Sequence, residues 1–188
     1  MEKNEQQQRQ SQDKGMYLRF GAMILTAMFV MYWVMFVASW ELSHVRFSES
    51  RVFMALAMGG TMGLVMLGWM LNMYKNTKAN IIIVLVSILL FSAGVALDRS
   101  QITVEDIGFM RGMIPHHSLA ITRSERAQIE DVRLCELAYE ISEAQRREIA
   151  EMDWLIQDIQ RNGLAETPEE AASRPIPEFQ VDPVRECP

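Results

Sequence analysis

The stretch FGAMILTAMFVMYWVMFVASW, residues 20–40, contains no Asp, Glu, Lys or Arg. Two further stretches share this property, residues 52–74 and residues 81–97. A helix needs about 17 to 25 apolar residues to cross a bilayer, and a helix that is apolar all round is unusual in a protein that faces only water. The sequence therefore predicts three transmembrane helices within residues 16–98, with lipid as the partner of their outer surfaces.

Positive charges indicate how these helices are oriented. Four basic residues precede the first apolar stretch: Lys3, Arg9, Lys14 and Arg19. Two lysines, Lys75 and Lys78, lie between the second and third stretches. The intervening loop carries Arg46 and Arg51 beside Glu41 and Glu49. Because cytoplasmic loops carry an excess of Lys and Arg, we expect a cytoplasmic tail at residues 1–15. Three crossings then place the C-terminal half in the periplasm, if the membrane is a bacterial inner membrane.

Methionine and glycine in the membrane segment each allow two interpretations. The chain has 15 methionines, and those from Met54 to Met70 recur at every fourth position. Thioethers bind soft ions such as Cu(I), but steps of four residues wind around a helix by about 40° each, so the filling of apolar space is the favoured interpretation. Gly59 and Gly63 form a G-x-x-x-G pair, which allows close contact either among the three helices or between two copies of the chain.

Charge and cysteine content limit the function further. The formal net charge is -6, and no basic patch of the kind that binds phosphates is visible, so we expect no nucleic-acid partner. A disulfide of Cys135 and Cys187 within one chain, a disulfide between chains, and free thiols all remain open. His44, in the short loop after the first helix, is interpreted as an ordinary exposed histidine.

The residues after the membrane segment have the pattern of amphipathic helices. We expect an antiparallel helical hairpin in residues 101–161. Its first helix should run from about 104 to 127, with a kink or a restart at Pro115. Its second helix should begin after the N-cap Asp131 and end at Asn162-Gly163. The remaining residues, 162–188, are rich in proline and acids, and this composition predicts disorder.

Candidate metal ligands gather in MRGMIPHH, residues 110–117. Met110, Met113 and His117 have i, i+3, i+7 spacing and lie within about 60° of one another on a helix. His116 points about 100° away from His117. Apolar residues share the side of the first three, so the ligands should face the packed interior. Two thioethers beside a histidine pair favour a metal site over a histidine that is merely packed in the core.

The second helix supplies further candidates, because Gln145, Glu148 and Met152 interrupt its apolar stripe. A buried carboxylate without a partner is costly, so an inward Glu148 needs a histidine, an arginine or a metal ion. The predicted metal ligands are Met110, Met113, His116, His117, Glu148 and Met152. The alternative is a hydrogen bond between Glu148 and a histidine that only orients the hairpin. We expect the flanking Arg146, Arg147 and Glu143 on a solvated face.

At these residues the sequence resembles the bacterial domain of unknown function 305 family. The signature is an acidic residue and Phe before M-I-P-H-H, then an A-I pair, then Q-x-x-E-I-x-x-M. The matching residues are Asp106, Phe109, Met110, Met113, Ile114, Pro115, His116, His117, Ala120, Ile121, Gln145, Glu148, Ile149 and Met152. The resemblance covers about residues 104–160. The three apolar stretches, with MYKNTKAN at residues 73–80, also resemble a membrane-anchored subgroup.

The resemblance implies a ferritin-like helical bundle and a role in metal homeostasis or tolerance, since some periplasmic members bind copper or silver. One hairpin is half of a four-helix bundle, so we expect a homodimer with the predicted ligands near a shared core. Di-iron proteins use paired Glu-x-x-His motifs, whereas this chain has Glu148 and Met152 at Glu-x-x-x-Met spacing. Oxidase chemistry therefore lacks its usual ligands.

Taken together, the sequence predicts an all-α, membrane-anchored protein that binds a copper ion, with Cu(I) favoured over other transition metals. It would buffer, sense or pass on the metal, the last with a periplasmic metal-handling partner. The alternative is a structural or partner-docking membrane protein in which the histidine pair is only structural. No nucleophile with a neighbouring base is visible, so we expect no enzymatic activity.

Overall fold

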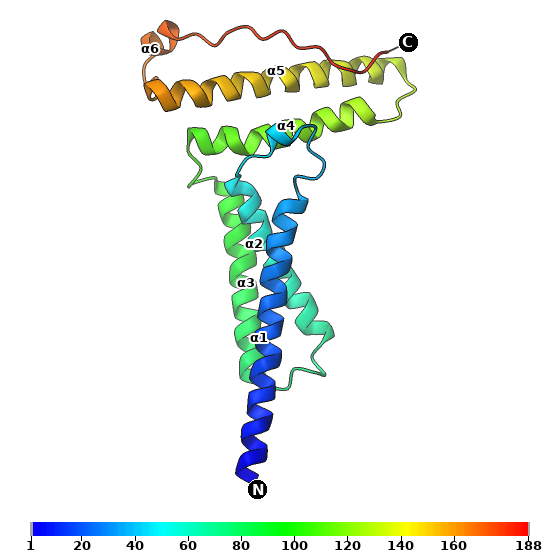
Figure 1. Cartoon of the computed structure of the whole chain (residues 1–188), viewed down its shortest axis with the longest axis vertical. Coiled ribbons are helices and arrows are strands. Elements are labelled where there is room, and N and C mark those ends of the chain that lie inside the picture. Colours follow the sequence, from blue (N-terminus) through cyan, green and yellow to red (C-terminus); the bar gives the residue numbers. More distant parts are fainter. Residues whose placement is uncertain (1, 188) are drawn as a thin grey trace. The chain divides into compact units, whose positions relative to one another are not determined.

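The computed structural model describes residues 2–187, with side chains from Lys14 onward. Within these residues the chain forms α-helices and one 3-10 turn, and no strand (Figure 1). The elements are α1 (Glu2–Val34), η1 (Leu42–His44), α2 (Glu49–Trp69), α3 (Thr77–Ser100), α4 (Asp106–Arg126), α5 (Val132–Asn162) and α6 (Pro168–Ser173). The predicted all-α class is confirmed. The helices form two compact units, one from residues up to Met35 together with residues 50–103, the other from residues 36–49 together with residues from Val104 onward.

The first unit contains three helices that are long and apolar enough to cross a membrane. They cover Lys14–Val34, Glu49–Met70 and Thr77–Ser100. The three apolar helices predicted from the sequence are confirmed, and they indicate association with a membrane. The first helix differs from the expected stretch, because α1 ends at Val34 and Trp40 belongs to the second unit.

Small residues let α2 and α3 approach closely. A Cβ atom on Gly94 of α3 would lie 2.6 Å from the carbonyl oxygen of Phe53 and 2.7 Å from the backbone nitrogen of Ala57, both on α2. The two glycines of the G-x-x-x-G pair are equally close to their neighbours. A Cβ atom added to Gly59 would clash with the Met28 side chain of α1, and one added to Gly63 would clash with the Ser87 hydroxyl of α3. The pair therefore serves contacts among the three helices of one chain.

Methionines fill the space around the core of the first unit. Its buried residues are Phe20, Ile24, Leu67 and Tyr74. The side chains packed against them include Met16, Met28, Met62, Met66 and Met70. This placement fits the use of methionine as a flexible filler between helices.

The second unit is built on the antiparallel hairpin of α4 and α5. Asp131 is the N-cap of α5, and its side chain accepts hydrogen bonds from the backbone N–H groups of Arg133 and Leu134. At the other end Gly163 has a φ of 80°, which suits glycine and ends the helix. The predicted start and end of this helix are therefore confirmed. Pro115 does not interrupt α4, which continues to Arg126 as one helix.

The loop between α1 and α2, residues 36–49, packs against the hairpin. The backbone N–H of Trp40 donates to Ser118 Oγ over 2.7 Å, and the guanidinium of Arg46 donates to Asp153 over 3.1 Å. Thus a segment that sequence analysis treated as a short connection is one layer of the second unit.

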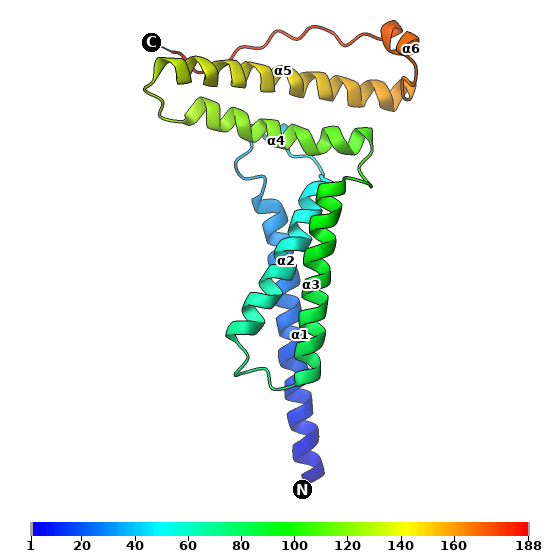
Figure 2. The same cartoon turned by 180° about the vertical axis from the view of Figure 1, so that it is seen from behind.

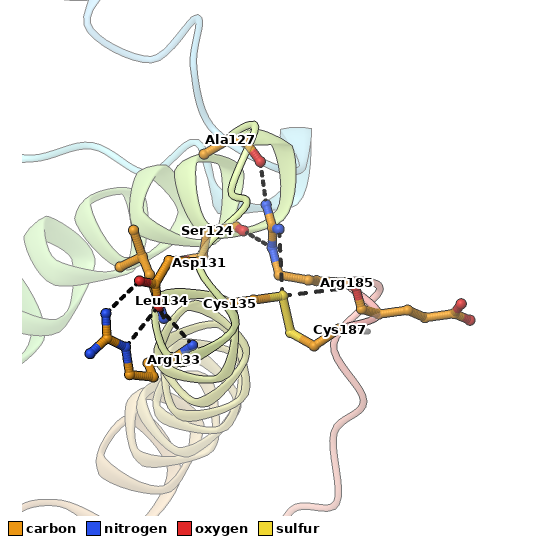
Figure 3. Close-up of a disulfide and its surroundings, with 9 residues drawn as sticks. Ser124, Ala127, Asp131, Arg133, Leu134, Cys135, Arg185 and Cys187 are labelled. Carbon is orange, nitrogen blue, oxygen red and sulfur yellow. Dashed lines mark hydrogen bonds and ion pairs between the residues drawn. A yellow bond between two sulfur atoms is a disulfide. The ribbon is translucent and has the colours of Figure 1, made fainter.

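The C-terminal segment is also held by the hairpin, in contrast to the disorder expected from its composition. Arg174 donates to Asp158 over 2.6 Å, and Cys187 forms a disulfide with Cys135 of α5. Next to the disulfide, the guanidinium of Arg185 donates to the carbonyl oxygens of Ser124 and Ala127 (Figure 3). These carbonyls belong to the end of α4, where no helical N–H group can reach them. The arginine thus caps α4 and also opposes the negative end of its dipole.

Substitution of Gly94 tests the contact between α2 and α3. Gly94→Ala places a methyl group against two backbone atoms that cannot move aside, and we expect a loss of about 1 to 3 kcal/mol in the free energy of unfolding. Gly21→Ala is the matched control, because no atom lies within 4 Å of the added Cβ there. Thermal unfolding of the purified protein in detergent, followed by circular dichroism, should show a lower midpoint for Gly94→Ala alone.

Removal of the disulfide tests whether the C-terminal segment stabilises the hairpin. The disulfide closes a sequence separation of 52 residues, and the chain-entropy model gives such a cross-link about 4 kcal/mol. We expect a lower unfolding midpoint and faster tryptic cleavage of the segment in the wild type after reduction by dithiothreitol. The double variant Cys135→Ser/Cys187→Ser should behave like the reduced protein and should not respond to the reductant.

Candidate metal centre

His117 and Glu148 form the centre of the predicted site. His117, on α4, is buried, and its Nδ1 lies 2.9 Å from the carbonyl oxygen of Met113 one turn earlier. Its Nε2 lies 2.7 Å from Glu148 Oε2 on α5. The structure thus brings together a base and an acid that are 31 positions apart in sequence.

The two bonds of His117 define where protons must be. A carbonyl oxygen only accepts, so Nδ1 carries a hydrogen and donates it to Met113. Nε2 then faces the Glu148 carboxylate over 2.7 Å. A metal ion bound here could take both atoms as ligands. The bond from Nδ1–H to the backbone would then orient the ring, as is usual for histidine ligands.

Two of the three predicted methionines lie in the core of the hairpin, and the third packs against that core. Met110 and Met152 are buried in one apolar cluster of α4 and α5, and Met113 packs against that cluster. His116 differs from the prediction, because its ring is exposed and stands edge-on to the ring of His117 with 6.0 Å between centroids. Consecutive residues on a helix point about 100° apart, so only one of the two histidines can face the core.

The set of donors limits which ions fit. In the part of the chain that the structure describes, no group of three or more His, Cys, Asp or Glu residues is arranged to hold a metal ion. The cysteines are joined in the disulfide and are not available as thiolates. A metal at His117 and Glu148 would therefore need thioether ligands or ligands from another chain. Hard ions such as Mg²⁺ and Ca²⁺ need several oxygen ligands, so this pair does not fit them.

Glu125 organises a second buried network that sequence analysis missed. Its side chain is 2% exposed, and its Oε1 accepts hydrogen bonds from Ser142, Arg146 and the backbone N–H of Val184. Burial would raise the pKa of this carboxyl group, but the hydrogen bonds and the charge of Arg146 bring the pKa below its ordinary value. Arg146 also lies over the Trp40 ring, 5.0 Å from its centroid. The expectation that Arg146 lies on a solvated face is wrong, because burial of Glu125 requires a cation beside it.

His44 joins the loop 36–49 to α4 and is not an ordinary surface histidine. Its Nδ1 lies 2.8 Å from Ser118 Oγ, the same buried hydroxyl that accepts from Trp40. Burial lowers the pKa of the imidazole below its ordinary value. Glu41 and Asp153 act against this shift, whereas Arg46 and Arg146 add to it. These contacts bridge 74 or more positions in sequence, and no local pattern signals them.

The fold and the site define a membrane-associated, all-α protein with a helical hairpin that carries a His–Glu pair. The histidine of this pair is buried, and the side chain of Glu148 is 42% exposed. The family model "Domain of unknown function (DUF305)" matches residues 106–178. The chain is also 35% identical over 107 residues to the uncharacterized protein L153 of Acanthamoeba polyphaga mimivirus. The aligned residues cover 52% of this chain and 68% of that protein. No solved structure matches the chain. The chain belongs to the DUF305 family, as the resemblance of its motifs predicted.

The lowered pKa of His44 predicts a pH dependence of stability. The unfolded chain takes up a proton near pH 6.5, whereas the folded chain resists protonation at this site. The contribution of His44 to the free energy of unfolding is therefore complete above about pH 6.5 and is lost as the pH falls below that value. Denaturation at several pH values between about 5 and 8 should show a steeper loss for the wild type than for His44→Gln. Parallel curves for the two proteins would contradict this assignment.

Proposed function

We propose that this chain is a membrane-anchored metal-binding protein for a soft transition-metal ion, with Cu(I) as the first candidate, and that it acts in metal homeostasis or tolerance. The observation that carries the proposal is the contact of 2.7 Å between His117 Nε2 and Glu148 Oε2. The pair lies on a hairpin whose apolar cluster contains Met110 and Met152, with Met113 packed against it. The pair lies inside the stretch matched by the family model.

The chemistry of the donors favours a soft ion. Thioethers bind Cu(I) and are poor ligands for hard cations, and they need no deprotonation. Imidazole suits several transition metals, and the carboxylate would suit Cu(II) or Zn(II). Met110, Met113 and Met152 shift this balance towards Cu(I), because they are the remaining candidate ligands on the same two helices. In the bound state His117 would bind through Nε2 and Glu148 through its carboxylate.

The distribution of positive charge gives the proposal a location. We place the N-terminal segment in the cytoplasm and the hairpin in the periplasm of a bacterial inner membrane, because Lys and Arg are concentrated before α1 and between α2 and α3. The disulfide of Cys135 and Cys187 agrees with an oxidising compartment. In that position the protein would buffer copper, or exchange it with a soluble metal-handling partner.

A docking function without metal is the second candidate. It is favoured by the fact that the bond between His117 and Glu148 already satisfies both groups, so the pair stabilises the hairpin without an ion. In that case the hairpin would present a surface to another protein.

Metal titration separates the two candidates. We expect the detergent-purified wild type to bind Cu(I) in competition with a chromophoric Cu(I) chelator. Affinity should fall at least about tenfold in His117→Ala and in Glu148→Gln, because each change removes a ligand. It should fall less in His116→Ala, whose ring is exposed. Affinity for Cu(I) should also weaken as the pH decreases, because protons compete for Nε2.

His44→Gln is the matched control, since it removes a histidine of the same unit that does not contact the pair. It should keep the Cu(I) affinity of the wild type at pH 7.5. Glu148→Gln retains an oxygen acceptor for His117, so its helix content should match the wild type by circular dichroism. Wild-type affinity in both His117→Ala and Glu148→Gln would refute the copper proposal. A loss of helix content in these variants without any effect on metal would support the docking function.

A further inference from the structure

The hairpin of α4 and α5 has two broad faces, and the chain covers only one of them. The loop 36–49 lies on the first face, where Trp40 and His44 contact Ser118 and Arg46 contacts Asp153. Figure 2 shows the hairpin from the side opposite η1, and there no described segment of the second unit crosses α4 or α5. We name this second side the open face.

Helical geometry places large exposed apolar side chains away from the residues that contact the loop. On α5, Leu134, Leu137 and Ile141 lie about 100° to 160° around the helix from Asp153, and on α4 Phe109 lies about 180° from Ser118. Leu134, Leu137 and Ile141 follow i, i+3, i+7 spacing on α5 and are 50%, 49% and 38% exposed. Phe109 on α4 is 56% exposed. Ile141 and Glu148 are again seven positions apart, so the acid of the metal pair lies on the same strip. An apolar strip around an acid and a histidine is typical of an interaction surface.

The position of the His–Glu pair within the hairpin suits two-fold symmetry. His117 lies next to the midpoint of α4 (Asp106–Arg126), and Glu148 next to the midpoint of α5 (Val132–Asn162). In an isologous interface, residues at the centre of the patch meet the same residues of the other copy. A second hairpin placed on the open face about a central axis would therefore bring two His117–Glu148 pairs together.

We propose that the open face is the interface with a second copy of this chain, and that the two copies together complete the metal site of His117 and Glu148. This inference rests on the proposed function. One chain offers fewer than three His, Cys, Asp or Glu donors at the pair, within the part that the structure describes. Two chains offer two imidazoles, two carboxylates and the neighbouring thioethers.

The size of the open face alone would give a weak dimer. From Leu134 to Glu148 the strip is about 21 Å long, and two helices each about 10 Å wide give roughly 420 Å². This is about half of the ~800 Å² per partner of a typical stable complex. The apolar helices α1 to α3 confine copies to one bilayer with their hairpins on one side, which raises their effective concentration and offsets the smaller area.

The test measures oligomeric state and metal content on the same full-length samples. Native mass spectrometry of the protein released from lipid nanodiscs should give twice the chain mass, with one Cu(I) for two chains. Leu137→Glu/Ile141→Glu places four charges in the dimer interface, and we expect monomers with normal helix content and at least about tenfold weaker Cu(I) binding. Leu164→Glu is the matched control, because this exposed leucine lies beyond α5, and it should remain dimeric with full affinity.

The outcomes separate this inference from the proposed function. A monomeric wild type that still binds Cu(I) overturns the shared site and leaves the metal function intact. Full Cu(I) affinity in Leu137→Glu/Ile141→Glu also overturns the shared site. A dimeric wild type that holds one ion per chain overturns it as well. A dimer that Leu137→Glu/Ile141→Glu dissociates, but that never binds Cu(I), refutes the metal function and keeps the interface.

Discussion

The second unit depends on one buried carboxylate, that of Glu125. Through a single oxygen it binds Ser142 and Arg146 of α5 and the backbone of Val184 in the C-terminal segment, and Arg146 in turn lies over Trp40 of the loop 36–49. A buried charge must be compensated, and these partners supply the compensation. Four segments that are far apart in sequence are thereby fixed to one another, and their side chains gain defined positions.

This arrangement determines which face of the hairpin carries His117 and Glu148. The loop occupies one face of the hairpin, and the C-terminal segment is tied to the α4–α5 turn by Arg185 and the disulfide. The face that remains carries His117 and Glu148 together with exposed apolar side chains. His117 is therefore buried, whereas the Glu148 side chain is 42% exposed and can be reached from this face. The proposed metal site and the proposed interface both depend on this face of the hairpin.

Local patterns predicted part of the candidate site. Spacing along one helix placed Met110, Met113 and His117 on one side, and the polar interruption of the next helix predicted a Glu148 that contacts a histidine, which the structure shows. Glu148 is less buried than expected, because its side chain is 42% exposed. The same helical geometry explains why His116 faces solvent, since adjacent residues cannot share a face. By contrast, His44, Ser118 and Glu125 gave no signal. Their partners lie tens of positions away, and each of these residues alone looks like ordinary polar surface.

The sequence by itself determined the apolar helices, the ends of α5 and the family, because hydrophobic periodicity, caps and motifs act over a few residues. Tertiary structure decided which histidine meets Glu148, that Cys135 pairs with Cys187 within the chain, and that the loop and the C-terminal segment pack on the hairpin. It also decided that Gly59 and Gly63 serve contacts within one chain. These are contacts between distant segments, and they form only when burial brings opposite charges, sulfur atoms or small residues to the same point in space.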